Sequence, residues 1–228
     1  MVKKNDSGNY SCIIPVHNEE KTGMGPLEEV SKIKDMDKVV CVDDGSTDDS
    51  AKIIKEKFPD FELVQLKENK GKAEAIRQGL KRINTEYLLL VDADLKNLDK
   101  KEIEYAIKKT RNNEPDMVIL KRINAPSRLK LFRLNTLLSG ERILKTDELR
   151  KILGSGCQGY EIEVATNEYM IKNNKKVFWS PHSGRNVIRK KKWEIHKNSY
   201  LKMYMRNLDY LGMVSALRQI TTFCRKRI

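Results

Sequence analysis

Short apolar segments alternate with segments of helical periodicity along the first half of this chain. The apolar segments are too short for helices and too apolar for loops, and they lie at residues 11–15, 38–42, 61–66, 87–91 and 117–120. Helical spacing is found between them, at residues 49–58, 72–83 and 99–111. This alternation predicts an α/β protein with a mainly parallel sheet that is flanked by helices.

The region after residue 120 is less regular. A basic, Leu-rich helix is expected after Pro126 and Ser127, a second helix is expected to begin at Thr146, and residues 161–173 have the pattern of an amphipathic helix. The composition then shifts near Pro181 towards basic residues.

The positive charge of the chain is concentrated at its C-terminal end. The 228 residues include 45 Lys and Arg and 32 Asp and Glu, a formal net charge of +13. Residues 171–228 hold 15 of the basic residues and two acidic ones, which leaves 30 of each in residues 1–170. A neutral body with a basic extension is unlike most nucleic-acid-binding proteins, whose charge is spread over the fold, so nucleic acid is not favoured as a partner.

These shifts in pattern and charge predict two parts. The body is expected at residues 10–181, with a regular half at 10–110 and a less regular half at 111–181, and the basic, mostly helical extension at 182–228.

The cysteines and the N-terminus bear on the cellular location. Cys12, Cys41, Cys157 and Cys224 are far apart and lack the spacing of a metal site, so reduced thiols are expected. The N-terminal segment lacks the apolar run of a signal peptide, and no stretch approaches the 18 to 20 apolar residues of a membrane span. The chain is therefore expected to be cytoplasmic, either soluble or peripheral at a membrane surface.

Polar clusters follow the predicted strands. The first strand is followed by VHNEE, the second by DDGSTD and the fourth by DAD. Because ligands bind at the carboxyl ends of parallel strands, these clusters are expected to meet at one edge of the sheet. Crowded carboxylates repel one another, so a cation or several hydrogen-bond donors are expected to share that edge.

Asp92 and Asp94 form the sharpest of these clusters. The alternation of a strand end points both side chains the same way, which gives two hard oxygen ligands for Mg²⁺ or Mn²⁺. A metal there would bridge a diphosphate and neutralise charge on the leaving group. An acidic pair in this place also fits a simple helix cap, and the two residues alone do not decide between these interpretations.

Four motifs taken together narrow the choice. SCIIPVHNEE, VVCVDDGSTDDS, NKGKAEAIRQGL and YLLLVDADL resemble, in order and spacing, the nucleotide-sugar-binding half of family 2 type glycosyltransferases with the GT-A fold, over about residues 10–110. The resemblance implies that fold and the transfer of a sugar from a nucleoside-diphosphate sugar to an acceptor hydroxyl or phosphate.

The same resemblance assigns roles within the donor site. Asp44 would hydrogen-bond the base, Lys72 would contact the diphosphate, and Asp92 and Asp94 would hold Mg²⁺ or Mn²⁺. Lys72 also begins a predicted helix, whose free N–H groups favour an anion. The remaining residues expected to line the nucleotide pocket are Pro15, His17, Asn18, Glu19, Asp43 and Ser46.

By the same likeness residues 111–181 would form the acceptor half, and they carry a second resemblance. LSGERIL and GYEIE resemble the SGE and GYGVE-type segments of glucosyl-3-phosphoglycerate synthases, although Glu161 replaces a glycine. Glu163 would be the acceptor-side carboxylate, with Glu161 as the second choice, while a charged helix face remains the alternative for these two glutamates. Glu163 and the metal ligand Asp94 would be the catalytic residues. His182 matches a late histidine that would complete the metal site, and His196 competes with it. The chain shows marks of both inverting and retaining enzymes.

The C-terminal extension permits three interpretations. Apolar residues recur at helical spacing between residues 201 and 217, and Arg225 to Arg227 follow. The apolar stripe fits packing against the body or a second subunit, the basic residues fit an anionic membrane surface, and nucleic acid comes third. A phosphorylated small molecule or a polyprenyl phosphate is accordingly the expected acceptor.

Two other functions compete with sugar transfer. A sugar-phosphate nucleotidyltransferase needs a Gly-rich, Arg-containing loop after the first strand, and PVHNEE is not one. A non-catalytic nucleotide-sugar or polyanion-binding protein would share the pocket without turnover, so replacing Asp92 and Asp94 by Asn separates it from an enzyme.

Overall fold

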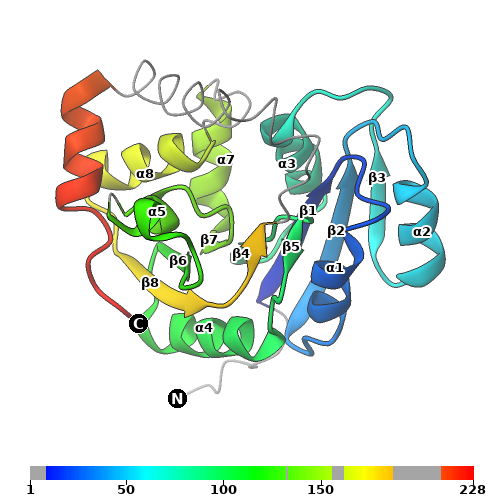
Figure 1. The fold of residues 1–228 in the computed structure, drawn as a ribbon, viewed down its shortest axis with the longest axis horizontal. Helices are drawn as coiled ribbons and strands as arrows, with labels where there is room; N and C mark the ends of the chain where they lie inside the picture. Colours follow the sequence, from blue (N-terminus) through cyan, green and yellow to red (C-terminus); the bar gives the residue numbers. More distant parts are fainter. Residues whose placement is uncertain (1–8, 132, 156–161, 187–211) are drawn as a thin grey trace.

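The computed structural model describes residues 9–131, 133–155, 162–186 and 212–228 (Figure 1). Its centre is a seven-stranded sheet with the strand order β3-β2-β1-β4-β7-β6-β8. The strands are β1 (Tyr10–Val16), β2 (Met36–Asp43), β3 (Glu62–Gln65), β4 (Tyr87–Leu90), β6 (Met117–Arg122), β7 (Arg142–Lys145) and β8 (Val177–His182).

The sheet is mainly parallel. β1 pairs in parallel with both β2 and β4, β2 with β3, and β6 with β8. β7 runs antiparallel to its neighbours β4 and β6. The carboxyl ends of β1, β2, β4, β6 and β8 therefore lie at the same edge of the sheet as the amino end of β7.

Helices cover both faces of the sheet because successive residues of each central strand point to opposite sides. Cys12 and Ile14 of β1 pack with α1, α2 and α4, whereas Ile13 packs with α3, α7 and α8. The helices are α1 (Met24–Ser31), α2 (Ser50–Lys57), α3 (Lys72–Leu80), α4 (Lys100–Asn113), α5 (Ser127–Leu131), α6 (Leu134–Leu137), α7 (Thr146–Gly154) and α8 (Ile162–Lys172). The strands are buried from both sides, which explains their nearly continuous apolar sequences.

Two further features complete the described fold. β5 (Leu95–Lys96) and β9 (Arg185–Asn186) form a small antiparallel sheet directly after Asp94. Residues 212–221 are helical, and the last residues of the chain run along the outer edge of β8. Trp179 N donates to Lys226 O at 3.0 Å, and Ile228 N donates to Trp179 O at 3.0 Å, so the chain itself covers this edge.

All five strands predicted from the sequence are present, as are the helices predicted at residues 49–58, 72–83, 99–111, 146 onwards and 161–173. The basic segment after Pro126 forms two short helices, α5 and α6. The prediction did not include α1, β7, β8 or the small β5–β9 sheet, and the expected domain boundary at residue 181 lies inside β8.

Two expectations about the location can be compared with the structure. Cys12, Cys41 and Cys224 are free and buried, while Cys157 lies outside the described residues. Within the described part of the chain, every helix is too short or too polar to cross a bilayer.

Candidate active site

The predicted nucleotide-pocket residues meet where β1 and β2 end. His17 Nδ1 donates to the carbonyl oxygen of Asp44 at 2.9 Å, and Asn18 N donates to Ser46 Oγ at 2.9 Å. Ser46 N donates in turn to Asp43 Oδ1 at 3.1 Å. The two loops, although 28 residues apart in sequence, therefore hold each other in one conformation.

Glu19 and Pro15 support this arrangement from below. Glu19 is buried, its N donates to Ser50 Oγ at 2.8 Å, and its carboxylate accepts from Thr22 Oγ1. Pro15 pairs with Val42 of β2 beyond the point where the β1–β4 pairing ends at Ile13. Its missing N–H therefore costs the sheet no hydrogen bond, which is how proline is tolerated in a central strand.

Asp44 connects this pocket to the next loop. Its Oδ1 accepts from Lys70 N and its Oδ2 accepts from Gly71 N, both at 2.8 Å. A base-contacting role was expected for Asp44 from the sequence. The structure shows that this buried carboxylate also fixes the two residues immediately before Lys72.

Lys72, Asp92 and Glu163 come together although they lie far apart in the sequence. Lys72 Nζ is 2.6 Å from Asp92 Oδ1 and 2.7 Å from Glu163 Oε1. The three side chains are between 11% and 19% exposed. α3 supplies the lysine, the turn after β4 supplies Asp92, and the first turn of α8 supplies Glu163, so three separate elements converge on one ion-paired cluster.

Gly140 leaves room for this cluster. A Cβ atom at residue 140 would lie 2.4 Å from Asp92 Oδ2 and 2.7 Å from Lys72 Nζ. Such separations are far inside van der Waals contact. The SGE segment therefore brings its backbone against the Asp92 carboxylate, and a larger residue there would displace the side chains of Asp92 and Lys72.

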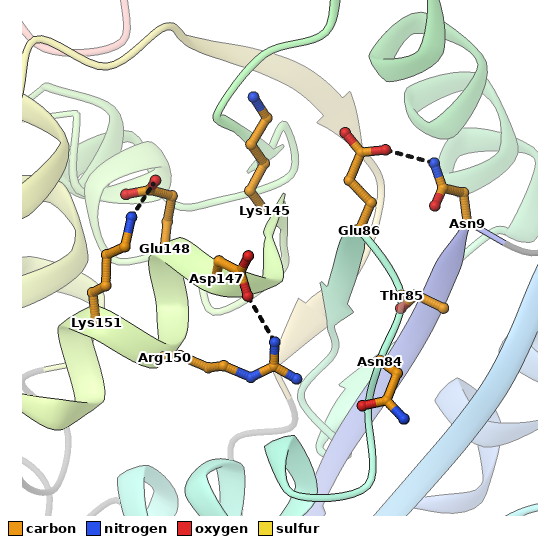
Figure 2. A pocket seen from close by; sticks show the side chains of 9 residues that line it. All are labelled: Asn9, Asn84, Thr85, Glu86, Lys145, Asp147, Glu148, Arg150 and Lys151. Carbon is orange, nitrogen blue, oxygen red and sulfur yellow. Dashed lines mark hydrogen bonds and ion pairs between the residues drawn. The ribbon is translucent and has the colours of Figure 1, made fainter.

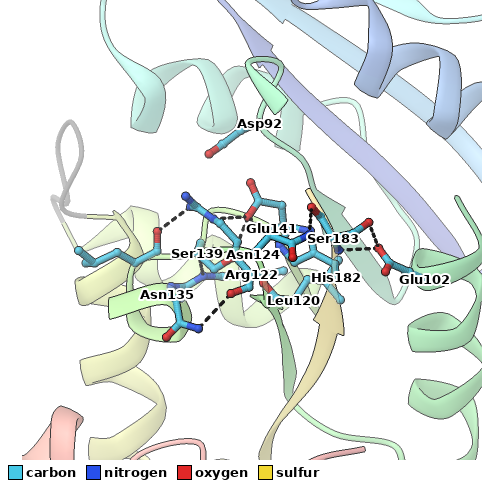
Figure 3. Close-up of polar contacts among 12 residues, drawn as sticks. Asp92, Glu102, Leu120, Arg122, Asn124, Asn135, Ser139, Glu141, His182 and Ser183 are labelled. Atoms are coloured by element: carbon cyan, nitrogen blue, oxygen red, sulfur yellow. Dashed lines mark hydrogen bonds and ion pairs between the residues drawn. The ribbon is translucent and has the colours of Figure 1, made fainter. Parts of the chain in front are cut away.

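A second buried cluster lies beside the first. Glu141 Oε2 accepts from Arg122 Nε at 3.2 Å and from Ser139 Oγ at 2.7 Å, and it lies 3.5 Å from His182 Nε2. Figure 3 shows Glu141 between Arg122 and His182, with Asp92 on one side. Glu141 and His182 are fully buried, yet Glu141 Oε1 and both ring nitrogens of His182 have no hydrogen-bond partner among the residues that the structure describes.

Arg142 connects the backbone around Glu163 to the loop before β7. It is buried, and its guanidinium donates to the carbonyl oxygens of Ser139, Leu137 and Glu163 and to Asn167 Oδ1, at 2.8 to 3.1 Å. Asn167 Nδ2 also donates to Leu137 O at 3.0 Å. This network joins the loop before β7 to the first turns of α8, and so it orients Glu163 towards Lys72.

The electrostatics reflect the burial of like charges. Burial raises the pKa of Asp92 to about 6, Lys72 opposes this shift, and Glu141, Asp94 and Glu163 reinforce it. Burial lowers the pKa of Lys72, but its two carboxylate partners outweigh that effect and raise the pKa above its ordinary value. Burial would raise the pKa of Glu141, yet Arg122 and His182 hold it well below the usual range. The site therefore holds more carboxylates than its cations fully neutralise.

The donor atoms fit a divalent cation. Asp92 and Asp94 offer hard carboxylate oxygens, and His182 offers a buried imidazole that no described residue hydrogen-bonds, a set that suits Mg²⁺ or Mn²⁺. Among the described residues, no three such side chains stand close enough together to hold an ion as they are placed. His182 lies against Glu141 and Asp92 is paired with Lys72, so binding an ion requires these side chains to exchange partners.

Some predicted residues cannot be placed, and others were missed. Glu161 and His196 lie outside the described residues. Gly140, Glu141, Arg122 and Arg142 were not among the predicted site residues, although the LSGERIL segment that contains three of them was singled out.

A separate cavity of about 540 Å³ lies at the opposite edge of the sheet (Figure 2). It is lined by Asn9, Asn84, Thr85, Glu86, Lys145, Asp147, Glu148, Arg150 and Lys151. None of the predicted site residues that the structure describes lines it. Most of its charges are already paired, for example Arg150 with Asp147 at 2.7 Å. The chemistry is therefore concentrated at the other edge.

The sequence matches a known protein family. The family model described as Glycosyl transferase family 2 matches residues 11–165. Poly-beta-1,6-N-acetyl-D-glucosamine synthase of Staphylococcus epidermidis is 37% identical over 87 residues, which are 37% of this chain and 21% of that protein. The synthase of Staphylococcus aureus strain COL is 36% identical over 85 residues, again 21% of its length. The chain thus spans a small part of these relatives.

Solved structures show the same fold. Glucosyl-3-phosphoglycerate synthase from Mycobacterium tuberculosis, in complex with Mn²⁺, uridine diphosphate and phosphoglyceric acid, has a TM-score of 0.65 and 18% identity. That match covers 93% of this chain and 78% of the other. Residues 1–349 of S. aureus TarS have a TM-score of 0.60 and 23% identity, covering 77% of this chain and 58% of the other. These likenesses confirm the GT-A fold predicted from the sequence.

Proposed function

Because this chain belongs to glycosyl transferase family 2, we propose that it moves a sugar from a nucleoside-diphosphate sugar to a phosphorylated acceptor with the help of a divalent metal ion. The observation that carries this proposal is the buried cluster of Lys72, Asp92 and Glu163 at the carboxyl edge of the sheet. In this cluster a lysine that could bind a diphosphate lies in direct contact with a carboxylate that could bind a metal ion and with a second carboxylate.

The nucleoside would lie over the loops after β1 and β2. His17, Asn18 and Ser46 are partly buried and held by each other, which fixes the backbone against which a base and ribose would pack. Asp44 retains unused lone pairs on each carboxylate oxygen, so it can accept from a base N–H while it holds the loop before Lys72. Asp43 and Glu19 keep these loops in place from beneath.

The metal would be held by Asp92, Asp94 and His182. When bound, Mg²⁺ or Mn²⁺ would neutralise the charge that develops on the departing diphosphate. Burial and the neighbouring carboxylates disfavour the ionised form of Asp92 and raise its pKa, and a bound cation would offset both effects. Manganese in the complexes of the glucosyl-3-phosphoglycerate synthase supports the same choice of ion.

Lys72 and Glu163 would act on opposite sides of the reacting bond. A donor diphosphate would draw the Lys72 ammonium away from Asp92, which frees Asp92 for the metal and places a positive charge on the leaving group. Glu163, released from the same lysine, would contact the acceptor and either take its proton or stabilise positive charge on the sugar. Arg142 positions Glu163 for this role through the backbone of α8.

The acceptor is proposed to carry a phosphate. Phosphoglyceric acid occupies the structure of the glucosyl-3-phosphoglycerate synthase, which covers most of this chain. The basic C-terminal region of this chain, with 15 Lys and Arg against two acidic residues in residues 171–228, would attract such an acceptor. A small phosphorylated molecule and a polyprenyl phosphate share this chemistry.

Turnover of a donor panel tests the proposal. UDP-, GDP- and CDP-sugars are incubated with phosphoglycerate or with a polyprenyl phosphate, and release of the nucleoside diphosphate and of the glycosylated product is followed by mass spectrometry. We expect turnover that needs Mn²⁺ or Mg²⁺ and that is lost in the double variant Asp92→Asn, Asp94→Asn.

Asp60→Asn, a change at an exposed turn residue, serves as the matched control and should leave turnover intact. Undiminished turnover in the double variant, or equal turnover with a chelator, would show that the proposed site is wrong. Binding of a donor without any turnover across both acceptor classes would contradict the proposed acceptor chemistry.

A further inference from the structure

The helix at residues 212–221 carries a row of apolar side chains on its outer surface. Met213 is 75% exposed, Val214 is 81% exposed and Leu217 is 55% exposed. Residues three and four apart lie on one face of a helix, so the three side chains form one patch. Three large, contiguous apolar side chains at this level of exposure are unusual for a surface helix that has no partner.

The opposite face of this helix is fixed to the body. Ser215 Oγ donates to Glu168 at 3.2 Å, and the buried Gln219 donates to the carbonyl oxygen of Val164 at 3.3 Å. Phe223 and Cys224, just beyond the helix, are part of the core. In Figure 1 the helix, in red, lies beside α8 at the periphery of the molecule. Its rotation is therefore set by these contacts, and the apolar row points away from the protein.

The charge of this C-terminal segment has one sign. Residues 212–228 contain four basic residues and no acidic one. Arg218 is exposed and lies four residues after Val214, on the same side of the helix, and Arg225 and Lys226 are exposed beyond the helix end. The apolar patch therefore has Arg218 directly beside it, and further basic residues follow the helix along the chain.

We propose that this face binds the surface of an anionic lipid bilayer. Met213, Val214 and Leu217 would enter the boundary between headgroups and acyl chains, and the basic residues would lie at the level of the lipid phosphates. A second copy of the chain fits less well, because a two-fold contact over this face would bring the basic residues of both copies together. Nucleic acid would leave the three apolar side chains without a partner.

The position of the patch has a consequence for the acceptor. The helix packs on α8, and α8 carries Glu163 in its first turn. A bilayer beneath the helix would lie on the acceptor side of the molecule and would favour the lipid phosphate over the small phosphorylated molecule. This last step rests on the proposed function, whereas membrane binding itself does not.

Flotation of the full chain with lipid vesicles tests the proposal. Vesicles of phosphatidylcholine alone are compared with vesicles that also contain phosphatidylglycerol, at low and high salt. We expect binding to the anionic vesicles that weakens with salt. The variant Met213→Ser, Val214→Ser, Leu217→Ser should lose it, and Arg218→Gln should weaken it about fivefold.

Tyr105→Ser is the matched control, since Tyr105 is 42% exposed but lies in α4. It should bind the vesicles as the parent chain does. Circular dichroism and donor binding of the triple variant should equal those of the parent, because only exposed side chains change. Failure of the parent to bind, or equal binding of the triple variant, would overturn the proposal.

Gel filtration gives the remaining outcome. A dimer of the parent chain that becomes a monomer in the triple variant would assign the patch to a second copy and would also overturn the proposal. If the parent chain binds vesicles but shows no turnover of any donor, that result would count against the proposed function alone.

Discussion

Replacing Asp92 by Asn should make the metal-free protein more stable while it abolishes metal-dependent activity. The amide has nearly the shape of the carboxyl group and remains neutral at every pH of interest. Burial raises the pKa of Asp92 from 3.8 to about 6, so the ionised form is disfavoured in the folded state. The attraction of Lys72 is already included in this value, because Lys72 lowers the same pKa.

The size of the effect follows from the shift in pKa. One unit corresponds to about 1.4 kcal/mol, so ionised Asp92 destabilises the fold by at most about 3 kcal/mol. The side chain keeps 19% of its surface exposed, and solvent there reduces this figure. The folded pKa is raised, so the penalty is absent below the unfolded value near 4, grows as the pH rises through 6, and is complete above it.

Urea unfolding in the presence of a chelator measures this difference. Asp92→Asn should raise the free energy of unfolding by about 2 kcal/mol near pH 8 and should change it little near pH 4. The control Asp60→Asn, at an exposed turn residue, should give the same stability as the parent chain at both values. A variant that is less stable than the parent near pH 8, or a difference that does not depend on pH, would refute the electrostatic reasoning.

Two further substitutions test the surroundings of Asp92. Gly140→Ala places a methyl group 2.4 Å from Asp92 Oδ2, so the affinity for the donor, measured by calorimetry, should fall by about tenfold or more. The control Gly154→Ala, whose Cβ meets nothing within 4 Å, should leave this affinity unchanged. Equal affinities in the two variants would contradict the close packing at Gly140. Arg142→Met leaves buried acceptors at Ser139, Glu163 and Asn167 without their donor. The free energy of unfolding, measured with urea, should fall by about 3 kcal/mol, a figure that allows for the gain from removing a buried charge. An unchanged urea midpoint would show that the network does not contribute to stability.

The sheet could be predicted because its central strands are buried on both faces and are therefore apolar along their whole length. Val39 to Val42 and Leu88 to Val91 are apolar on both faces, and helices with clear periodicity separate them. β7 could not be found in this way, since it is four residues long and begins with Arg142. Arginine is normally exposed, but Arg142 is buried. The direction of β7, antiparallel between two parallel strands, depends on contacts between distant segments that no local pattern encodes.

The donor side of the site followed from motifs, whereas its connections did not. The motifs identified Asp44, Lys72 and Asp92, but the ion pairs of Lys72 join residues up to 91 positions apart. A glutamate is normally exposed, and the sequence gives no sign that Glu141 is buried between Ser139 of its own loop, Arg122 of β6 and His182 of β8. A buried charge can be recognised only when its partners are known.

Binding of uridine diphosphate with and without Mn²⁺ tests the central claim most directly, because it isolates the site from the unknown acceptor. Isothermal calorimetry is performed on the parent chain and on Asp94→Asn. The site described above predicts that Mn²⁺ strengthens binding by about tenfold or more in the parent chain and has no effect in the variant. Equal affinity with and without the metal ion in the parent chain, or full enhancement in Asp94→Asn, would contradict a metal-bridged diphosphate at this edge of the sheet.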